Sequence, residues 1–188
     1  ILNSNIDMQN YIWEPVAFQG TFKSSDGNNY TISNLQIKSS SNYVGFFSIL
    51  GKSTISNIKF SYTQILEGSN QSAGILAGYI SGNSNINNVD LSNPYISSNS
   101  TYAGGLIGYT SNAIISINNC DINLIRTNGV INNLGGIVGY TSINTSITRC
   151  NASGVLLNAI KRVGGITSTN YGLITSSSVG GTINSLNE

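Results

Sequence analysis

Two aspartates at matching places in a repeated block are the residues of this chain best spaced for chemistry. Asp90 and Asp121 each occupy the fifth place of a similar six-residue block, and the two blocks begin 31 residues apart, at Ile86 and Ile117. If the blocks stack on neighbouring coils, the two carboxylates lie about 5 Å apart on an outer surface. Such a pair could supply the acid and nucleophile of a glycosidase, or bind a calcium ion weakly.

The alternative for this pair is a column of solvated side chains. The same place in the other copies of the block is taken by Gln36, Lys59 and Asn151. Lys59 would offset part of the repulsion, and like charges opposed in water cost little. The chain has no His, which removes histidine-based triads and the common zinc sites. We therefore expect no catalytic residue, no metal site and no cofactor.

Composition limits the partners of the chain. Only 8% of the 188 residues are charged, and the net charge is +1. A chain with so few charges and so small a net charge lacks the basic patch that binds nucleic acid. No run of about 20 apolar residues is present, so we expect no membrane insertion. The sequence begins Ile-Leu-Asn without a leader, which suggests a processed product or a piece of a longer chain.

Two motifs repeat with one period of about 30 residues, which identifies a repeat architecture. The first contains a glycine after an apolar residue, and its copies are at Gly45, Gly74, Gly104, Gly135 and Gly164. The second is the six-residue block, and its copies begin at Ile32, Ile55, Ile86, Ile117, Ile147 and Ile174. Each unit holds short β-branched runs broken by Gly, Asn and Ser, with no helical periodicity.

No single unit can bury an apolar face alone, so the units must stack. The sequence therefore predicts an all-β, right-handed parallel β-helix, or β-solenoid, of five to six coils with about three short strands each. Residues 1–20 are expected to form an amino-terminal cap in which Trp13 covers the first coil. Residues 21–188 are expected to form one solenoid domain, with ends that could associate with other copies.

The six-residue block also predicts a corner. Its first, fourth and sixth residues are apolar and cannot all point inward along one regular strand, so the chain must turn between them. The residues placed at that corner are Asn34, Asn57, Asn88 and Asn119. Asn tolerates left-handed conformations, and stacked amides could form a hydrogen-bonded ladder. The glycine column suits a tight turn or a close backbone approach.

Tyrosines and cysteines form further columns. Tyr79, Tyr109 and Tyr140 share one place in three repeats. If they point outward they form an aromatic strip that could bind sugars or a protein, and if they point partly inward they belong to the core. Cys120 and Cys150 share an inward place in consecutive coils, where a disulfide is sterically conceivable. We expect free buried thiols, because Cys at such places behaves as a small apolar residue.

The glycine blocks resemble a known family. The run Ala103-Gly104-Gly105-Leu106-Ile107-Gly108-Tyr109, followed by Ile117-Asn-Asn-Cys120, is similar to the GLUG-motif repeats of bacterial surface proteins. The leading segment around Trp13-Glu14-Pro15-Val16 resembles the part that often precedes such repeats. The resemblance covers about residues 5–182. It implies a right-handed β-helix displayed outside the cell, of the kind found in adhesins and in the non-catalytic regions of IgA-specific metallopeptidases.

The sequence thus favours a non-enzymatic structural or adhesive module at the cell surface or outside the cell. Its expected partners are glycans or host and cell-surface proteins. The alternatives are a carbohydrate-active β-helix enzyme that uses Asp90 and Asp121, and a glycan-binding module that uses another outer face. Ice binding is disfavoured, because the candidate row is too mixed: Ser33, Ser56, Asn87, Asn118, Thr148 and Thr175.

Overall fold

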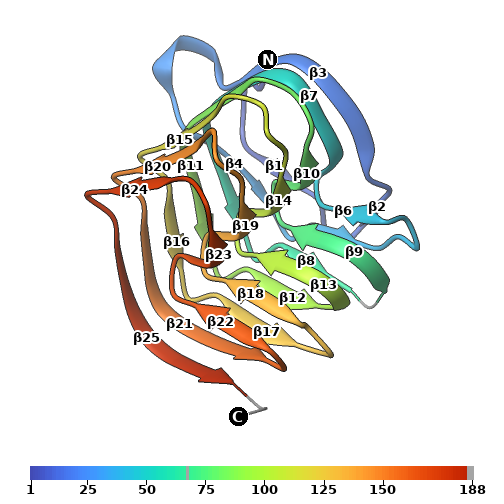
Figure 1. The fold of residues 1–188 in the computed structure, drawn as a ribbon. Helices are drawn as coiled ribbons and strands as arrows, with labels where there is room; N and C mark the ends of the chain where they lie inside the picture. The colour runs from blue at the N-terminus through green and yellow to red at the C-terminus, as the bar shows by residue number, and fades with distance from the viewer. Residues whose placement is uncertain (67, 186–188) are drawn as a thin grey trace.

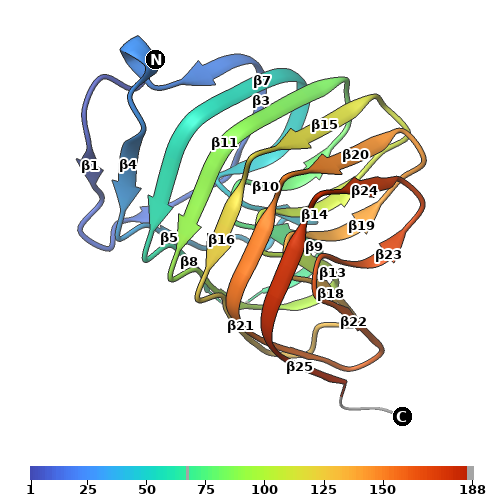
Figure 2. The same cartoon turned by 90° about the vertical axis from the view of Figure 1, so that its left-hand side faces the viewer.

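The repeats wind into a parallel β-solenoid of about six coils in a computed structural model, which describes residues 1–66 and 68–185 (Figures 1 and 2). The strands are β1 (Ile6–Asp7), β2 (Ile12–Trp13), β3 (Val16–Lys23), β4 (Tyr30–Ser33), β5 (Gln36–Ile37), β6 (Tyr43–Val44), β7 (Phe47–Ser61), β8 (Gln64–Ile65), β9 (Ser69–Gly74), β10 (Ala77–Ile80), β11 (Ser84–Ser92), β12 (Tyr95–Ser97), β13 (Asn99–Gly104), β14 (Ile107–Thr110), β15 (Ile115–Asn118), β16 (Asp121–Asn123), β17 (Arg126–Asn128), β18 (Asn133–Gly135), β19 (Val138–Thr141), β20 (Thr145–Thr148), β21 (Asn151–Ala159), β22 (Arg162–Gly164), β23 (Thr167–Asn170), β24 (Leu173–Thr175) and β25 (Ser178–Ser185).

These strands confirm the all-β solenoid predicted from the repeats. The strand pairs of the described residues run parallel, in one sheet of 20 strands and one of five. The one helical segment in this part of the chain is a 3-10 turn at Ser25–Gly27. None of the described helical segments has the length and apolarity that a membrane span needs. One coil, residues 115–141, contains the five short strands β15 to β19, whereas about three strands per coil were expected.

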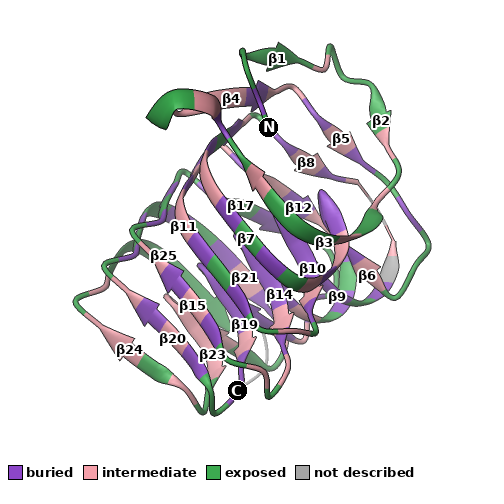
Figure 3. Cartoon of the chain, turned by 90° about the horizontal axis from the view of Figure 1, so that it is seen from above, coloured by how far each residue is buried: buried purple, intermediate pink, exposed green. Residues whose placement is uncertain are grey.

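The core is a stack of equivalent apolar residues. One ladder passes through β3, β7, β11, β15, β20 and β24, one strand segment from each coil. The first residues of the six-residue blocks stack on it and are fully buried at Ile55, Ile86, Ile117 and Ile147. Buried and more exposed residues alternate along these strands, as Figure 3 shows. Stacking thus buries the apolar face that no single unit could cover.

The predicted corner is present in the central coils. Asn57, Asn88 and Asn119 have φ angles of 57°, 54° and 51°, in the left-handed region that Asn tolerates. The amide of Asn88 donates a hydrogen bond of 2.9 Å to Oδ1 of Asn57. The ladder stops there, because Asn119 donates instead to Oδ1 of Asn87, at 3.0 Å.

The placement of Asn34 in this column is wrong. β4 pairs Ile32 with Phe60 rather than with Ile55, whose partner is Phe22 of β3. The extra residues around the 3-10 turn shift the phase of the first copy. The sequence carried this signal, because Ile32 and Ile55 are only 23 residues apart, whereas Ile55 and Ile86 are 31 apart.

A second left-handed corner, which the sequence analysis did not predict, contains Asn34. Its φ is 54°, and the corner continues through Tyr62, Asn93, Leu124 and Gly154. Backbone hydrogen bonds connect successive coils here, for example from the Tyr62 N–H to the Ser92 carbonyl and from the Asn93 N–H to the Asn123 carbonyl. The mixed residue types hid this column, since only some of them favour positive φ.

The glycine column marks a close approach between two layers of backbone. Gly74, Gly104, Gly135 and Gly164 stack in register on the five-stranded sheet. A Cβ at Gly74 would lie 2.5 Å from the backbone nitrogen of Gly108 and 2.7 Å from the carbonyl oxygen of Ala77. Side chains therefore cannot fit between the layers, and the sequence prediction of a close approach is confirmed.

Both end coils of the solenoid leave apolar side chains exposed. Residues 6–23 form the strands β1, β2 and β3, which pair with the coil that follows and leave Ile12 and Val16 63% and 46% exposed. The indole of Trp13 stacks on Phe46 at 4.7 Å and donates a 2.7 Å hydrogen bond to the Phe46 carbonyl. In the last described coil, Val179 and Ile183 remain about 40% exposed.

Candidate functional site

A ridge of six tyrosines is the most extended aromatic feature of the described surface. We call it the tyrosine ridge, and its members are Tyr43, Tyr79, Tyr102, Tyr109, Tyr140 and Tyr171. Its tightest contact is the parallel stack of Tyr109 on Tyr140, with ring centres 4.5 Å apart. Tyr43 stacks on Tyr79 at 4.8 Å, and Tyr171 reaches Tyr140 at 5.7 Å. The rings therefore form one continuous strip along the coils.

The glycine motif explains why these rings point outward. Tyr79, Tyr109 and Tyr140 each follow a glycine that faces the other backbone layer, and a Cβ at Gly108 would meet backbone atoms of Gly78 and Ala73. Because successive strand residues alternate between faces, the tyrosine after each inward glycine lies on the outer face. The three tyrosines are in register: Tyr79 pairs with Tyr109, and Tyr109 with Tyr140.

The sequence pattern predicted only half of the ridge. It placed Tyr79, Tyr109 and Tyr140 together, but missed the rings that enter from other elements. Tyr43 and Tyr102 lie on the five-stranded sheet, each two residues before a glycine of the glycine column. That shared spacing was the available signal.

The ridge is neither core nor fully solvated. Five of its rings are partly buried, whereas Tyr171 is 60% exposed. Burial raises the pKa of Tyr109, and the neighbouring Tyr140, Tyr102 and Tyr79 add to this shift. The phenol of Tyr109 therefore stays neutral at physiological pH. A neutral, preorganised strip of rings can stack on sugars or on apolar side chains.

Asp90 and Asp121 do lie on neighbouring coils. The backbone N–H of Asp121 donates a 3.2 Å hydrogen bond to Oδ1 of Asp90. Both residues line a shallow hollow of about 350 Å³ together with Lys59 and Asn123. Burial raises the pKa of Asp90 despite this backbone bond and despite Lys59. Among the described residues, no group of three or more His, Cys, Asp or Glu side chains could hold a metal ion.

One member of the predicted column around these aspartates is wrong. Thr31, rather than Gln36, pairs with Lys59, whereas Gln36 pairs with Gln64 on another face. The cause is the phase shift of the first copy. Asn151 is placed as predicted, since it pairs with Asp121 and donates a 2.9 Å hydrogen bond to its Oδ1.

Replacing Asp90 is expected to change the pH dependence of stability. Because the pKa of Asp90 is raised above its ordinary value of 3.8, folding disfavours the ionised form. Its contribution to stability is therefore full below pH 3.8 and is lost as the pH rises through the raised pKa. We expect Asp90→Asn to raise the melting temperature modestly at pH 7, with the difference vanishing near pH 3. Thermal denaturation from pH 3 to 7 measures this.

Asp26→Asn is the matched control for that experiment, because it removes an exposed carboxylate elsewhere. An Asp90→Asn variant that is less stable than the wild type at pH 7 would contradict the account. The same holds if the difference between the variants stays constant across the pH range.

The two cysteines are buried free thiols. The Sγ of Cys120 lies 3.2 Å from the Asn118 carbonyl oxygen, and that of Cys150 lies 3.3 Å from the Thr148 carbonyl oxygen. A hydrogen bond with the Cys150 thiol, together with burial, raises the pKa of Cys120 well above its usual range. Cys120 is thus a protonated core residue and a poor nucleophile.

The geometry therefore contains one aromatic strip and one carboxylate pair on outer surfaces, and cysteines that only fill the core. Comparisons with protein-family models, with curated proteins and with solved structures find no match to this chain.

Proposed function

We propose that this chain is a non-enzymatic binding module of a cell-surface or secreted protein, and that its tyrosine ridge is the contact surface for a glycan or a cell-surface protein. The observation that carries the proposal is the unbroken series of ring contacts from Tyr43 to Tyr171. The resemblance of the glycine blocks to GLUG-motif repeats supports the same class of protein.

The physics of the ridge suits binding. Tyr offers a large apolar area with few rotatable bonds, so little conformational entropy is lost when a partner packs on it. Here the rings already support one another, and the parallel stack of Tyr109 on Tyr140 further restricts their motion. The strands below hold the rings at the spacing of the coils. A partner would therefore meet a rigid surface, in keeping with a stalk or adhesive segment.

A glycan-array screen of the purified chain, with and without calcium, tests this proposal. We expect a specific hit that is lost in Tyr109→Ala and kept in Tyr62→Ala. Tyr62 is 56% exposed and lies outside the ridge, so it is a matched control. Because Tyr109 is partly buried, Tyr171→Ala serves as a second ridge variant with less effect on folding.

A hit that survives both ridge variants would overturn the role of the ridge. A blank array would direct the search to protein partners, with the same variants used in binding assays against cell-surface proteins. Failure of both searches would leave the ridge without a partner and would favour a spacer.

A carbohydrate-active enzyme is the second candidate, and the environment of Asp90 favours it. Its carboxyl has a raised pKa and lies beside Asp121 in a hollow on the outer surface. Retaining glycosidases use two carboxyls about 5–5.5 Å apart, one of which must be protonated at working pH. This candidate requires turnover of a glycan that either Asp90→Asn or Asp121→Asn abolishes.

A further inference from the structure

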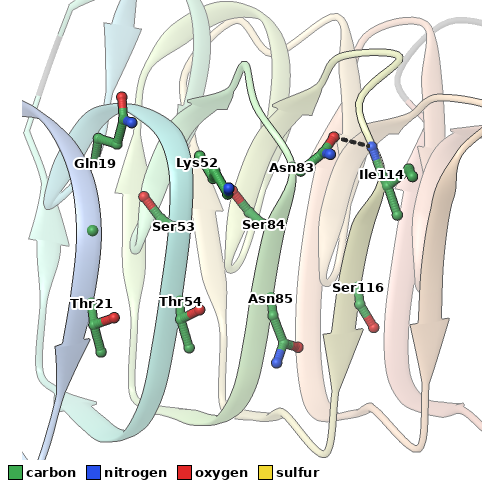
Figure 4. A pocket seen from close by; sticks show the side chains of 11 residues that line it. Gln19, Thr21, Lys52, Ser53, Thr54, Asn83, Ser84, Asn85, Ile114 and Ser116 are labelled. Atoms are coloured by element: carbon green, nitrogen blue, oxygen red, sulfur yellow. Dashed lines mark hydrogen bonds between the residues drawn. The ribbon is translucent and has the colours of Figure 1, made fainter.

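A trough crosses the outer face of β3, β7, β11 and β15, and no tyrosine of the ridge is among the residues that line it (Figure 4). It has a volume of about 650 Å³, within the usual range for ligand sites. Two rows of side chains border it. The upper row in Figure 4 consists of Gln19, Lys52, Asn83 and Ile114, and the lower row consists of Thr21, Thr54, Asn85 and Ser116.

The floor between the two rows is made of small residues on three of the four strands, and of the buried Ile115 on the fourth. Gly20, Ser53 and Ser84 pair with one another in register on neighbouring coils. The buried Ser84 hydroxyl donates a 2.7 Å hydrogen bond to the Gly51 carbonyl, so it is occupied inside the protein.

The lower row contains one side chain from each of four successive coils. Thr21 pairs with Thr54, Thr54 with Asn85, and Asn85 with Ser116. With strands about 4.8 Å apart, the four side chains extend over roughly 14 Å parallel to the solenoid axis. A ligand that makes equivalent contacts with each of them must also be extended and must repeat along its length.

Most polar groups of the lower row are free to bind such a ligand. Within the described part of the chain, no hydrogen bond involves the side chains of Thr21, Thr54 or Asn85, whereas the Ser116 hydroxyl accepts one of 2.7 Å from Asn118. In the upper row, the Asn83 Oδ1 accepts a 3.0 Å bond from the Ile114 N–H, which leaves its amide N–H groups to donate. Ile114 is 67% exposed and adds an apolar contact.

The chemistry of these rows indicates the class of ligand. Hydroxyls and amides both donate and accept, which matches the hydroxyls of a sugar. Lys52 is the one charged residue among those that line the trough, so a strongly anionic polymer finds little electrostatic attraction. A peptide strand is also a poor fit, because the floor is a sheet face. The backbone of β7 is already paired with β3 and β11.

We propose that this trough binds a linear, neutral polysaccharide lying parallel to the solenoid axis. Each coil contributes one side chain from each row, so affinity grows with the number of sugar units until the four strands are covered. The apolar face of a sugar ring packs against Ile114. The site is separate from the tyrosine ridge.

Titration of the ¹⁵N-labelled chain with cello-, xylo- and malto-oligosaccharides of two to six units tests the proposal by NMR. We expect at least one series to shift the amide signals of β3, β7, β11 and β15, with affinity rising with length. The double variant Thr54→Val and Asn85→Val is expected to weaken binding by at least about tenfold, because two polar contacts are lost. Raising the salt concentration should have little effect, since Lys52 is the one charged residue among the described residues that line the trough.

Thr101→Val is the matched control, because Thr101 is an exposed strand threonine on β13, outside the trough. Tyr109→Ala should also bind normally. If none of the three series shifts any signal at about 10 mM, where even weak sites fill, the proposal is wrong. If Tyr109→Ala abolishes binding and the double variant does not, the sugar lies on the ridge. That outcome would contradict the proposal that the trough binds the sugar, and it would leave the proposed function of the ridge intact.

Discussion

Gly108→Ala is expected to destabilise the solenoid by about 3 kcal/mol, the upper end of the usual cost of overpacking. An added Cβ would lie 2.6 Å from the Gly78 carbonyl oxygen and 2.7 Å from the Ala73 nitrogen. Both are backbone atoms of the preceding coil, so no flexible side chain can move aside. For a chain of this size we expect the melting temperature to fall by roughly 6–12 °C.

Gly180→Ala is the control for this substitution. A Cβ at Gly180 meets no atom within 4 Å, and its φ lies outside the left-handed region. Its melting temperature should stay near that of the wild type in the same thermal denaturation. A Gly108→Ala variant as stable as Gly180→Ala would show that the two backbone layers are not in contact.

Phe46→Ala is expected to open the amino-terminal coils. Phe46 lies at the centre of an aromatic cluster, with ring centres 4.7 Å from Trp13, 4.9 Å from Phe47 and 5.3 Å from Phe60. It is only 7% exposed. Removing a buried Phe costs about 3–5 kcal/mol, because the apolar contacts are lost and a cavity remains.

The loss should be local, since each coil of a solenoid contacts only its neighbours. Hydrogen exchange should therefore quicken in β1 to β5 before it changes in β15 to β21. Tyr11→Ala, which removes a ring that is 71% exposed in the first coil, should leave exchange unchanged. A uniform increase along the whole chain would contradict this distribution of stability.

The architecture was predictable because stacking repeats the same requirement in each coil. The isoleucines at 55, 86, 117 and 147 recur with a period set by one turn of the solenoid, and they are all buried. The corner at Asn88 was predictable because the apolar residues on either side of it could not all point inward along one regular strand. The close backbone approach was predictable from the regular spacing of the glycines, and a Cβ at these positions would meet backbone atoms.

The features that could not be predicted either interrupt the repeat period or combine residues from different columns. The 3-10 turn at Ser25–Gly27 adds residues between β3 and β4, and it moved Asn34 into a different column. The tyrosine ridge combines rings from two sheets, so a search along one column could find only three of them. The trough takes its lining from four strands, and the residue types change from coil to coil in both of its rows, so no repeated motif marks it.

The most direct test of the central claim, that this module binds without catalysing, is product analysis by mass spectrometry. The wild type and the Asp90→Asn, Asp121→Asn double variant are each incubated with the glycans that the array identifies and with neutral polysaccharides. We expect no shortened saccharide from either protein, and equal binding by both. Release of shorter saccharides by the wild type, lost in the double variant, would contradict the claim and identify the chain as a carbohydrate-active enzyme.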